Sequence, residues 1–395
     1  MACVHIFILL LKEKKGMLHY LNNAGAGLMS SNTLDVIIGH LQRERNIGAY
    51  LAAQESRSQI EEFYNRAANL VNAANPNEIA FMDSASRGWN MALHGAELCS
   101  RDHIVTLASE FGTNLITLFD RARQVGATVQ VIQCDSTGNF SIDEVATALN
   151  KGARMIAISH AAAHGSIVNP VHEIGTLAKQ YGAIYIVDGC QAVGQIPVDV
   201  RSIQCDAYIS TGRKWLCGPR GTGFLYIRAS SPFRTPQLDL ASADLVLDTE
   251  LKVLGVDVRT DARQFELWER NVASMIGLSS AMAEYLEQNQ STIAARIHAL
   301  ANRLRTVVSE NSNLNLLGRL DSESGIVGFY LTDPTREESV RDKFEQEGLG
   351  ISTMNDWDCP LHFPRNGATT IFRLSPHHYT PDSSVITACE ILSKI

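Results

Sequence analysis

The chain lacks the patterns typical of membrane, metal-binding and nucleic-acid-binding proteins. The apolar run VHIFILLL (Val4–Leu11) is too short to span a bilayer, and its charges follow it, which is the wrong order for a signal peptide. No histidine spacing such as H-E-x-x-H occurs, so no metal is expected. The formal net charge is −8 and there is no basic cluster, so we expect neither a nucleic acid nor a membrane as a partner.

The eight cysteines are scattered along the chain and include no C-x-x-C pair. Reduced intracellular thiols are distributed in this way, whereas disulfide frameworks and zinc sites show paired spacing. We therefore expect a soluble, cytoplasmic protein. Residues 1–20 are interpreted as an N-terminal extension without functional importance, with Met17 as an alternative start.

Short apolar runs alternate with helical patterns, which is typical of a mostly parallel sheet covered on both faces. Helical spacing is clearest at His40–Ala74, read as two helices broken near Gly48, and at Trp268–Leu286 and Ile297–Asn311. The predicted strands are Ile79–Met82, Ile104–Leu107, Val129–Ile132, Met155–Ile158, Ile184–Val187, Ala207–Ser210, Gly223–Ile227, Ile326–Leu331 and Ile371–Leu374. We predict an α/β fold with a large domain at 21–260 and a smaller α+β domain at 261–395.

Polar and aromatic residues just after the predicted strands form the candidate site, because ligands of such sheets collect at the carboxyl ends of the strands. Ser84 and Ser86 open a helix whose unpaired amides suit a phosphate, although an ordinary N-cap explains a serine there equally well. Phe111 lies at another strand end, either as a core residue or as a platform for a ring.

Two charged residues complete this candidate site. Asp188 follows four apolar residues, so its carboxylate requires a cation or donor, from a ligand or from a structural salt bridge. Lys214 stands in ISTGRKWLCGPRGTGFLYIR, either as a surface lysine or as a desolvated amine of lowered pKa that serves as nucleophile or base. An amine, an acid partner and a phosphate cradle are together what pyridoxal 5′-phosphate requires.

Two segments resemble a known family. IVDGCQAVGQIPVDV and DAYISTGRKWLCGPRGTGFLYIR are similar to the D-x-x-Q…S-G-H-K…G-P-x-G-x-G-x-L-Y pattern of class V aminotransferases and cysteine desulfurases, which are fold type I pyridoxal phosphate enzymes. The resemblance implies that Lys214 forms the Schiff base and that Asp188 pairs with the pyridine nitrogen. It also implies that Phe111 stacks on the ring and that Gln191 lies near the phenolic oxygen. The phosphate would be held by Ser84, Ser86, Thr211 and Arg213, with Ala85 as a further cofactor contact. FRLSPHHYT resembles the family's R-x-S-x-x-x-Y-N-T segment, so Arg373 is expected to bind a substrate carboxylate.

The departures from the family pattern bear on the reaction. Arg213 stands where the family usually has histidine, and HAAAHGS (His160–Ser166) lacks the asparagine that contacts the phenolic oxygen, which leaves that role to Gln191 and His164. HLQRERNIGAYLAA (His40–Ala53) resembles a helix start of the ergothioneine-type C–S lyases. This resemblance favours carbon–sulfur cleavage over transamination.

The predicted function is a β-elimination that cleaves the C–S bond of a cysteine-derived amino acid, such as a cysteine conjugate or its sulfoxide. An aminotransferase, a cysteine desulfurase, an epimerase and an inactive cofactor-binding accessory protein remain alternatives. Cys359 precedes Arg373 and is therefore a candidate for a persulfide carrier. Asp356 and Asp358, however, are expected to raise its pKa and disfavour the thiolate. The family resemblance implies a homodimer, with a contact from Gly218–Phe224 or from residues near 259–269.

Overall fold

The structure is a computed structural model that describes residues 19–364 and 367–395. The apolar run at the start, Met17 and all but two residues of the predicted N-terminal extension lie outside the described part of the chain. No helix among the described residues combines the length and the apolar character needed to cross a membrane.

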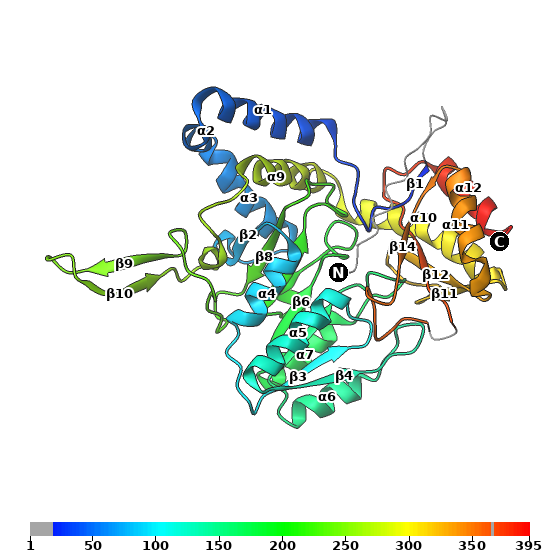
Figure 1. Cartoon of the computed structure of the whole chain (residues 1–395), viewed down its shortest axis with the longest axis horizontal. Coiled ribbons are helices and arrows are strands. Elements are labelled where there is room, and N and C mark those ends of the chain that lie inside the picture. The colour runs from blue at the N-terminus through cyan, green and yellow to red at the C-terminus, as the bar shows by residue number, and fades with distance from the viewer. Residues whose placement is uncertain (1–18, 365–366) are drawn as a thin grey trace.

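A seven-stranded sheet forms the centre of the molecule (Figure 1), and each of its strands begins and ends within one residue of a predicted strand. In spatial order the strands are β2 (Ile79–Met82), β8 (Gly223–Ile227), β7 (Ala207–Thr211), β6 (Ile184–Asp188), β5 (Met155–Ser159), β3 (His103–Leu107) and β4 (Thr128–Ile132). All neighbouring pairs are parallel except those that include β8. The predicted α/β architecture with a mostly parallel sheet is confirmed.

Both faces of this sheet are buried, which explains why its strands read as continuous apolar runs. Along β5, Ile156 and Ile158 belong to one apolar cluster, whereas Met155 and Ala157 belong to the cluster on the other face. The helices that contribute to the two clusters include α3 (Arg57–Leu70), α7 (Val171–Tyr181) and α9 (Val272–Leu286) on the first face, and α4 (Ala85–Gly95) and α5 (Gly112–Val125) on the second.

The N-terminal helical segment contains three helices, not the two that were predicted: α1 (Ser31–Ile47), α2 (Ala49–Glu55) and α3. The predicted break occurs at Gly48, whose φ of +88° is in the range that favours glycine. The second break, at Ser56, was not predicted because serine carries no comparable backbone signal. The remaining described α-helices before residue 260 are α6 (Ile142–Asn150) and α8 (Val200–Ile203).

A second, antiparallel sheet has the order β11 (Leu314–Leu317), β12 (Val327–Leu331), β15 (Ile371–Leu374) and β14 (Ser352–Met354). It shares an apolar core with α10 (Gln290–Glu310), α11 (Glu337–Gln346) and α12 (Asp382–Leu392). The first described strand, β1 (His19–Tyr20), pairs in parallel with β13 (Leu349–Gly350) in this part of the molecule. Helix α9 packs on α1 and α3 instead, so the division at residue 260 stays a prediction.

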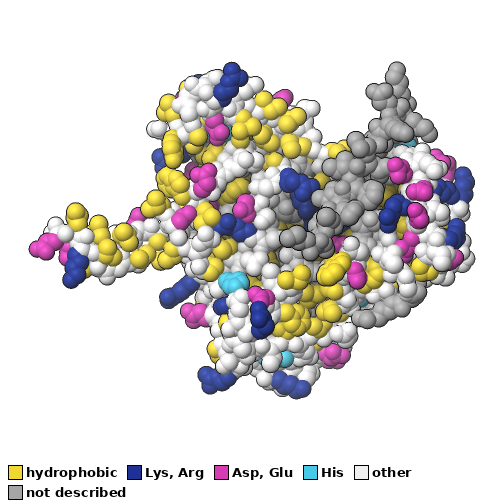
Figure 2. All heavy atoms as spheres, viewed as in Figure 1, with side chains coloured by type: hydrophobic (Ala, Val, Ile, Leu, Met, Phe, Trp, Pro, Cys, Tyr) yellow, Lys and Arg dark blue, Asp and Glu magenta, His cyan; other side chains and the backbone are white. Residues whose placement is uncertain are grey.

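A hairpin of β9 (Ala243–Leu247) and β10 (Val253–Val258) projects from the body of the protein (Figure 1), and the sequence analysis did not predict it. Its side chains are largely apolar, as the yellow atoms along the projection show (Figure 2). Successive residues of a strand point to opposite faces, yet Leu245 is 61% exposed and Val246 is 42% exposed. Neither face of the hairpin is therefore covered by the described chain.

Candidate active site

The sheet topology brings Asp188 and Lys214 to one place. Asp188 is the last residue of β6 and pairs with Ile209 on the neighbouring parallel strand β7, and Lys214 follows the end of β7 by three residues. The N-terminal segment closes over this turn, because the backbone N–H of Gly27 donates to the carbonyl of Arg213 at 2.8 Å. A Cβ on Gly27 would lie 2.4 Å from the Lys214 carbonyl oxygen, so only glycine allows this approach.

Burial and neighbouring charges change the pKa of the lysine at this place. Burial lowers the pKa of Lys214, and the positive charges of Arg213 and Arg373 lower it further. Cys190 and Asp188 act in the opposite direction, which shows that both lie close to the amine. A lowered pKa increases the fraction of neutral amine, which is the form that acts as nucleophile or base.

Asp188 is buried and is held by hydrogen bonds rather than by a cation. Asn114 Nδ2 donates to Oδ2 of Asp188 at 2.7 Å, and the backbone N–H of Cys190 donates to Oδ1 at 2.9 Å. Within residues 19–364 and 367–395 it forms no ion pair, so the alternative of a structural salt bridge does not hold there. A buried carboxylate that is fixed in this way suits a cationic ring nitrogen.

The N-terminus of α4 lies at the same edge of the sheet, because β2 and β7 run in the same direction on either side of β8. The hydroxyl of Ser84 accepts the backbone N–H of Arg87 at 3.2 Å and therefore acts as the N-cap, as the alternative interpretation had it. Ala85 and Ser86 occupy the first helical turn, whose N–H groups have no partner within the helix. Thr211 ends β7 nearby and donates to the carbonyl of Thr222 at 3.4 Å.

The two residues expected near the phenolic oxygen have different surroundings. Gln191 accepts the Trp215 indole N–H at 2.9 Å and donates one amide hydrogen to the carbonyl of Ala24 at 3.1 Å, which leaves one amide hydrogen unused. His164 Nε2 lies 2.8 Å from His362 Nδ1, and burial lowers the pKa of His164 to about 3. His164 is therefore a neutral side chain.

Arg373, on β15, has the character of a carboxylate-binding residue. It is buried and donates from Nε to Ser352 Oγ at 2.9 Å and from Nη1 to the Ala163 carbonyl at 2.8 Å. No carboxylate of the described chain forms an ion pair with it, although burial lowers its pKa only to about 10, so it is cationic at neutral pH. Phe111 packs against the apolar cluster that contains Ala163.

The thiol of Cys359 is fully buried in the same apolar cluster, close to Arg373. Burial raises the pKa of Cys359 to about 12, and Asp358 and Asp356 contribute. The predicted direction is correct, but the larger cause is burial and not the two acidic neighbours. The thiolate required for nucleophilic attack is strongly disfavoured in this arrangement.

Two residues of this site were missed by the sequence analysis although they follow a predicted strand. Glu110 and Asn114 come just after β3, in the same ASEFGTN segment as Phe111, and both are buried. The rule that polar residues at strand ends form the site would have selected them. His362 gave no such signal, because it meets His164 from a loop 198 residues further along the chain.

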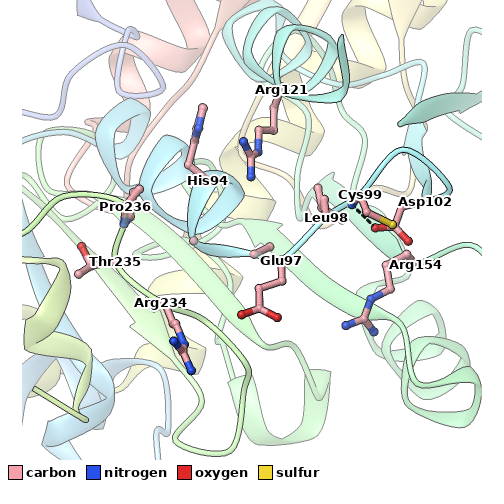
Figure 3. A pocket seen from close by; sticks show the side chains of 12 residues that line it. His94, Glu97, Leu98, Cys99, Asp102, Arg121, Arg154, Arg234, Thr235 and Pro236 are labelled. Atoms are coloured by element: carbon pink, nitrogen blue, oxygen red, sulfur yellow. Dashed lines mark hydrogen bonds between the residues drawn. The ribbon is translucent and has the colours of Figure 1, made fainter. Parts of the chain in front are cut away.

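A separate pocket of ≈ 570 Å³ lies at the opposite edge of the sheet, near the residues that precede β3 and β5 (Figure 3). It is lined by His94, Glu97, Arg121, Arg154 and Arg234 among others, and none of the candidate site residues contributes to it.

Among the described residues, no group of three or more His, Cys, Asp or Glu side chains gathers as it would around a metal ion.

Comparison with known families decides the membership of the chain. The family model described as aminotransferase class-V matches residues 19–385. The chain belongs to the class-V aminotransferase family. Class-V aminotransferases are enzymes that depend on pyridoxal phosphate, so the predictions of an enzyme and of this cofactor are confirmed.

Cysteine desulfurases are among the relatives of this class-V chain. The one of Escherichia coli (strain K12 / DH10B) is 26% identical over 362 residues, which cover 90% of this chain and 88% of the relative. The solved structure of the cysteine desulfurase of Thermococcus onnurineus NA1 superimposes with a TM-score of 0.85 at 22% identity and covers 95% of this chain and 94% of its own.

A cystine C–S lyase solved with its reaction product, cysteine persulfide, has a TM-score of 0.83 at 21% identity and covers 96% of this chain and 98% of its own. A mutant of that lyase, at the same TM-score and 20% identity over 96% of this chain and 97% of its own, carries glycine covalently linked to its pyridoxal phosphate cofactor. These two structures establish the fold. The chain is a class-V enzyme similar to cysteine desulfurases and C–S lyases.

The described residues of the site fit the cofactor of the family. A buried carboxylate without a cationic partner, an amine of lowered pKa and a helix N-terminus lie at the same edge of one sheet. These are an acid for the ring nitrogen, a group that joins the aldehyde and a site for the phosphate.

Proposed function

We propose that this class-V enzyme is a C–S lyase that eliminates the sulfur group from a cysteine-derived amino acid, such as a cysteine conjugate or its sulfoxide. The observation that carries the proposal is the state of Cys359. A fully buried thiol whose pKa is raised to about 12 is poorly suited to attack sulfur, whereas β-elimination requires no protein thiol.

The cofactor would be held by the residues around Lys214. In this proposal the Lys214 amine joins the cofactor aldehyde, Asp188 faces the ring nitrogen and Phe111 covers the ring. The phosphate would be bound by Ser84, Ala85, Ser86, Thr211 and Arg213, and the phenolic oxygen would face Gln191 and His164. When bound, the cofactor supplies an electron sink for the negative charge left at the α-carbon.

The protein's own residues then perform three tasks. Arg373 binds the substrate carboxylate and orients the α-carbon. The Lys214 amine would take the α-proton as the base, and its lowered pKa increases the fraction of the neutral form that can do so. The C–S bond then breaks, and the sulfur group leaves with the bonding electron pair. The remaining three-carbon fragment still carries the amino nitrogen, and one water converts it to pyruvate and ammonia.

A cysteine desulfurase is the second candidate, because relatives with that activity match 90% of this chain. In that reaction the sulfur of cysteine passes to a protein thiol as a persulfide, and the carbon skeleton leaves as alanine. The charge of Arg373 acts on Cys359, which supports a thiol near the proposed substrate site, but a segment around it would have to open before the thiol is free. An aminotransferase or an epimerase would use the same Lys214.

Product analysis separates these reactions. Purified holoenzyme is incubated with L-cysteine, L-cystine and a cysteine S-conjugate, and pyruvate, alanine and sulfide are measured. The proposal predicts pyruvate in equal amount to the sulfur product, and unchanged rates in Cys359→Ser. Alanine formation that disappears in Cys359→Ser would establish the desulfurase instead, and a lack of pyruvate, alanine and sulfide together would refute C–S cleavage.

We also propose that the enzyme is a cytoplasmic homodimer and that it belongs with the ergothioneine-type C–S lyases. The two uncovered faces of the β9–β10 hairpin support dimerisation, since isolated apolar surface of this extent usually meets a partner. The seven cysteines in the described part of the chain are all free thiols, which is consistent with a reducing compartment. The segment His40–Ala53 is the support for the lyase branch.

A further inference from the structure

A second carboxyl lies behind Asp188 and has no part in the proposed reaction. Glu110 is 1% exposed and stands just after β3, while Asp188 ends β6 and Ser159 ends β5. Three neighbouring strand ends therefore meet around one buried acid. Burying a carboxyl costs free energy unless hydrogen-bond donors surround it, so Glu110 requires such donors.

Asn114 joins the two carboxyls. Its amide Nδ2 donates to Oδ2 of Asp188 at 2.7 Å and to Oε1 of Glu110 at 2.9 Å, so both amide hydrogens are used. The reversed amide would turn its oxygen toward two acids, so these contacts fix its orientation. Glu110 in turn accepts the backbone N–H of Phe111 at 2.8 Å, the backbone N–H of Ser159 at 2.5 Å and the hydroxyl of Ser159.

This network does more than close the first turn of α5. The Glu110 carboxylate would satisfy the Phe111 amide without Asn114, and Asn114 would satisfy Asp188 without Glu110. Their connection instead transmits the position and charge of one carboxyl to the other. We propose that Asn114 and Glu110 form a positioning relay that orients Asp188 toward the cofactor ring and adjusts the electrostatic potential there. The inference rests on the proposed cofactor role of Asp188.

The charges of the site support this relay. Burial raises the pKa of Glu110 to about 7, and the charge of Asp188 raises it as well, so a charged Asp188 disfavours the ionised form of Glu110. The charged and titratable groups that face Lys214, beside Asp188, are Cys190, Arg213 and Arg373. A positive ring nitrogen against Asp188 would relieve the repulsion between the two acids.

The test measures the bound cofactor rather than turnover. The pH midpoint at which its visible absorption changes is recorded for the holoenzyme and for two variants, together with cofactor affinity by equilibrium dialysis. Glu110→Gln removes a negative charge and should lower the midpoint. Asn114→Ala removes the positive end of a dipole from both acids, so it should raise the midpoint and weaken cofactor binding by at least about tenfold. Gln124→Ala, which removes an exposed amide on the same helix, should change neither quantity.

Opposite shifts of the pH midpoint in the two variants would support the relay, because a general loss of structure gives no reason for the midpoint to fall in one variant and rise in the other. The isosteric Glu110→Gln is decisive if Asn114→Ala does not fold. Midpoints equal to that of Gln124→Ala, or shifts in the same direction, would overturn the relay while the cofactor site stands. A wild-type protein that binds no cofactor at Lys214 would overturn the site and the relay together.

Discussion

At the scale of single residues, the chemistry depends on buried charged side chains that are held by hydrogen bonds, without an ion pair among the described residues. Arg373 keeps its charge in a buried position, and two of its N–H groups donate hydrogen bonds to Ser352 and Ala163. Its fork is thereby oriented before a substrate arrives. This orientation is what distinguishes a binding arginine from a surface charge.

Arg373→Lys should raise KM for the amino-acid substrate by about 10- to 100-fold, with a smaller change in kcat. The lysine retains the charge but loses the bidentate geometry and both orienting hydrogen bonds. Steady-state kinetics measure the effect. Arg303→Lys, at an exposed arginine paired with Asp382, is the control and should leave KM unchanged. An unaltered KM in Arg373→Lys would remove the carboxylate role.

A buried histidine outside the cofactor contacts provides a prediction on pH. Burial lowers the pKa of His377 to about 3, so the folded state holds it neutral while the unfolded state binds a proton below pH 6.5. Its contribution to stability is present above pH 6.5 and is lost as the pH falls toward 3. His377→Gln should reduce the slope of unfolding free energy against pH by up to about 1.4 kcal/mol per pH unit in that window. Urea unfolding from pH 7 to 4 measures this, and parallel slopes would contradict it.

At the scale of elements, the N-terminus of α4 serves both the fold and the proposed phosphate site. Ser84→Ala removes the N-cap and should lower the unfolding free energy of the cofactor-free protein by about 1 kcal/mol. Asn271→Ala is the matched control, because Asn271 caps α9 through the N–H of Ser274 at 2.8 Å.

The two variants should lose similar stability in chemical denaturation, but only Ser84→Ala should weaken cofactor binding. Equal cofactor affinities in both variants would restrict Ser84 to capping and would place the phosphate elsewhere.

The sequence predicted the central sheet almost residue by residue, because its strands, apart from the partly exposed edge strand β4, are buried on both faces and bordered by turns. It failed for the β9–β10 hairpin, where apolar residues are exposed and therefore follow no inside–outside alternation. In the smaller sheet β12 and β15 match predicted strands, whereas β11 and β14 were missed, and β14 with three residues is too short for a periodic signal.

The site was predictable to the extent that it follows strand ends. Asp188, Lys214 and Phe111 were selected by that rule, and Asp188 does end β6 while Lys214 follows the end of the adjacent strand β7 by three residues. The pairing of His164 with His362 and the relay through Asn114 depend on contacts between distant segments. No local pattern encodes such contacts.

At the scale of the whole molecule, the projecting hairpin predicts association. Leu245 and Leu254 are 61% and 63% exposed, and covering them with a second copy removes apolar surface from water. Light scattering should give twice the 43.3 kDa of one chain for the wild type. The double variant Leu245→Lys/Leu254→Lys should shift the population toward the monomer. A monomeric wild type at micromolar concentration would contradict the proposed dimer.

The most direct test of the account identifies the lysine that binds the cofactor. The holoenzyme is reduced with borohydride, digested, and searched by mass spectrometry for the peptide that carries the reduced cofactor. We predict the adduct on Lys214 alone, its loss in Lys214→Ala with an unchanged circular dichroism spectrum, and a fall in turnover of at least about 10³-fold. An adduct on another lysine, or undiminished turnover in Lys214→Ala, would contradict the assignment of the site.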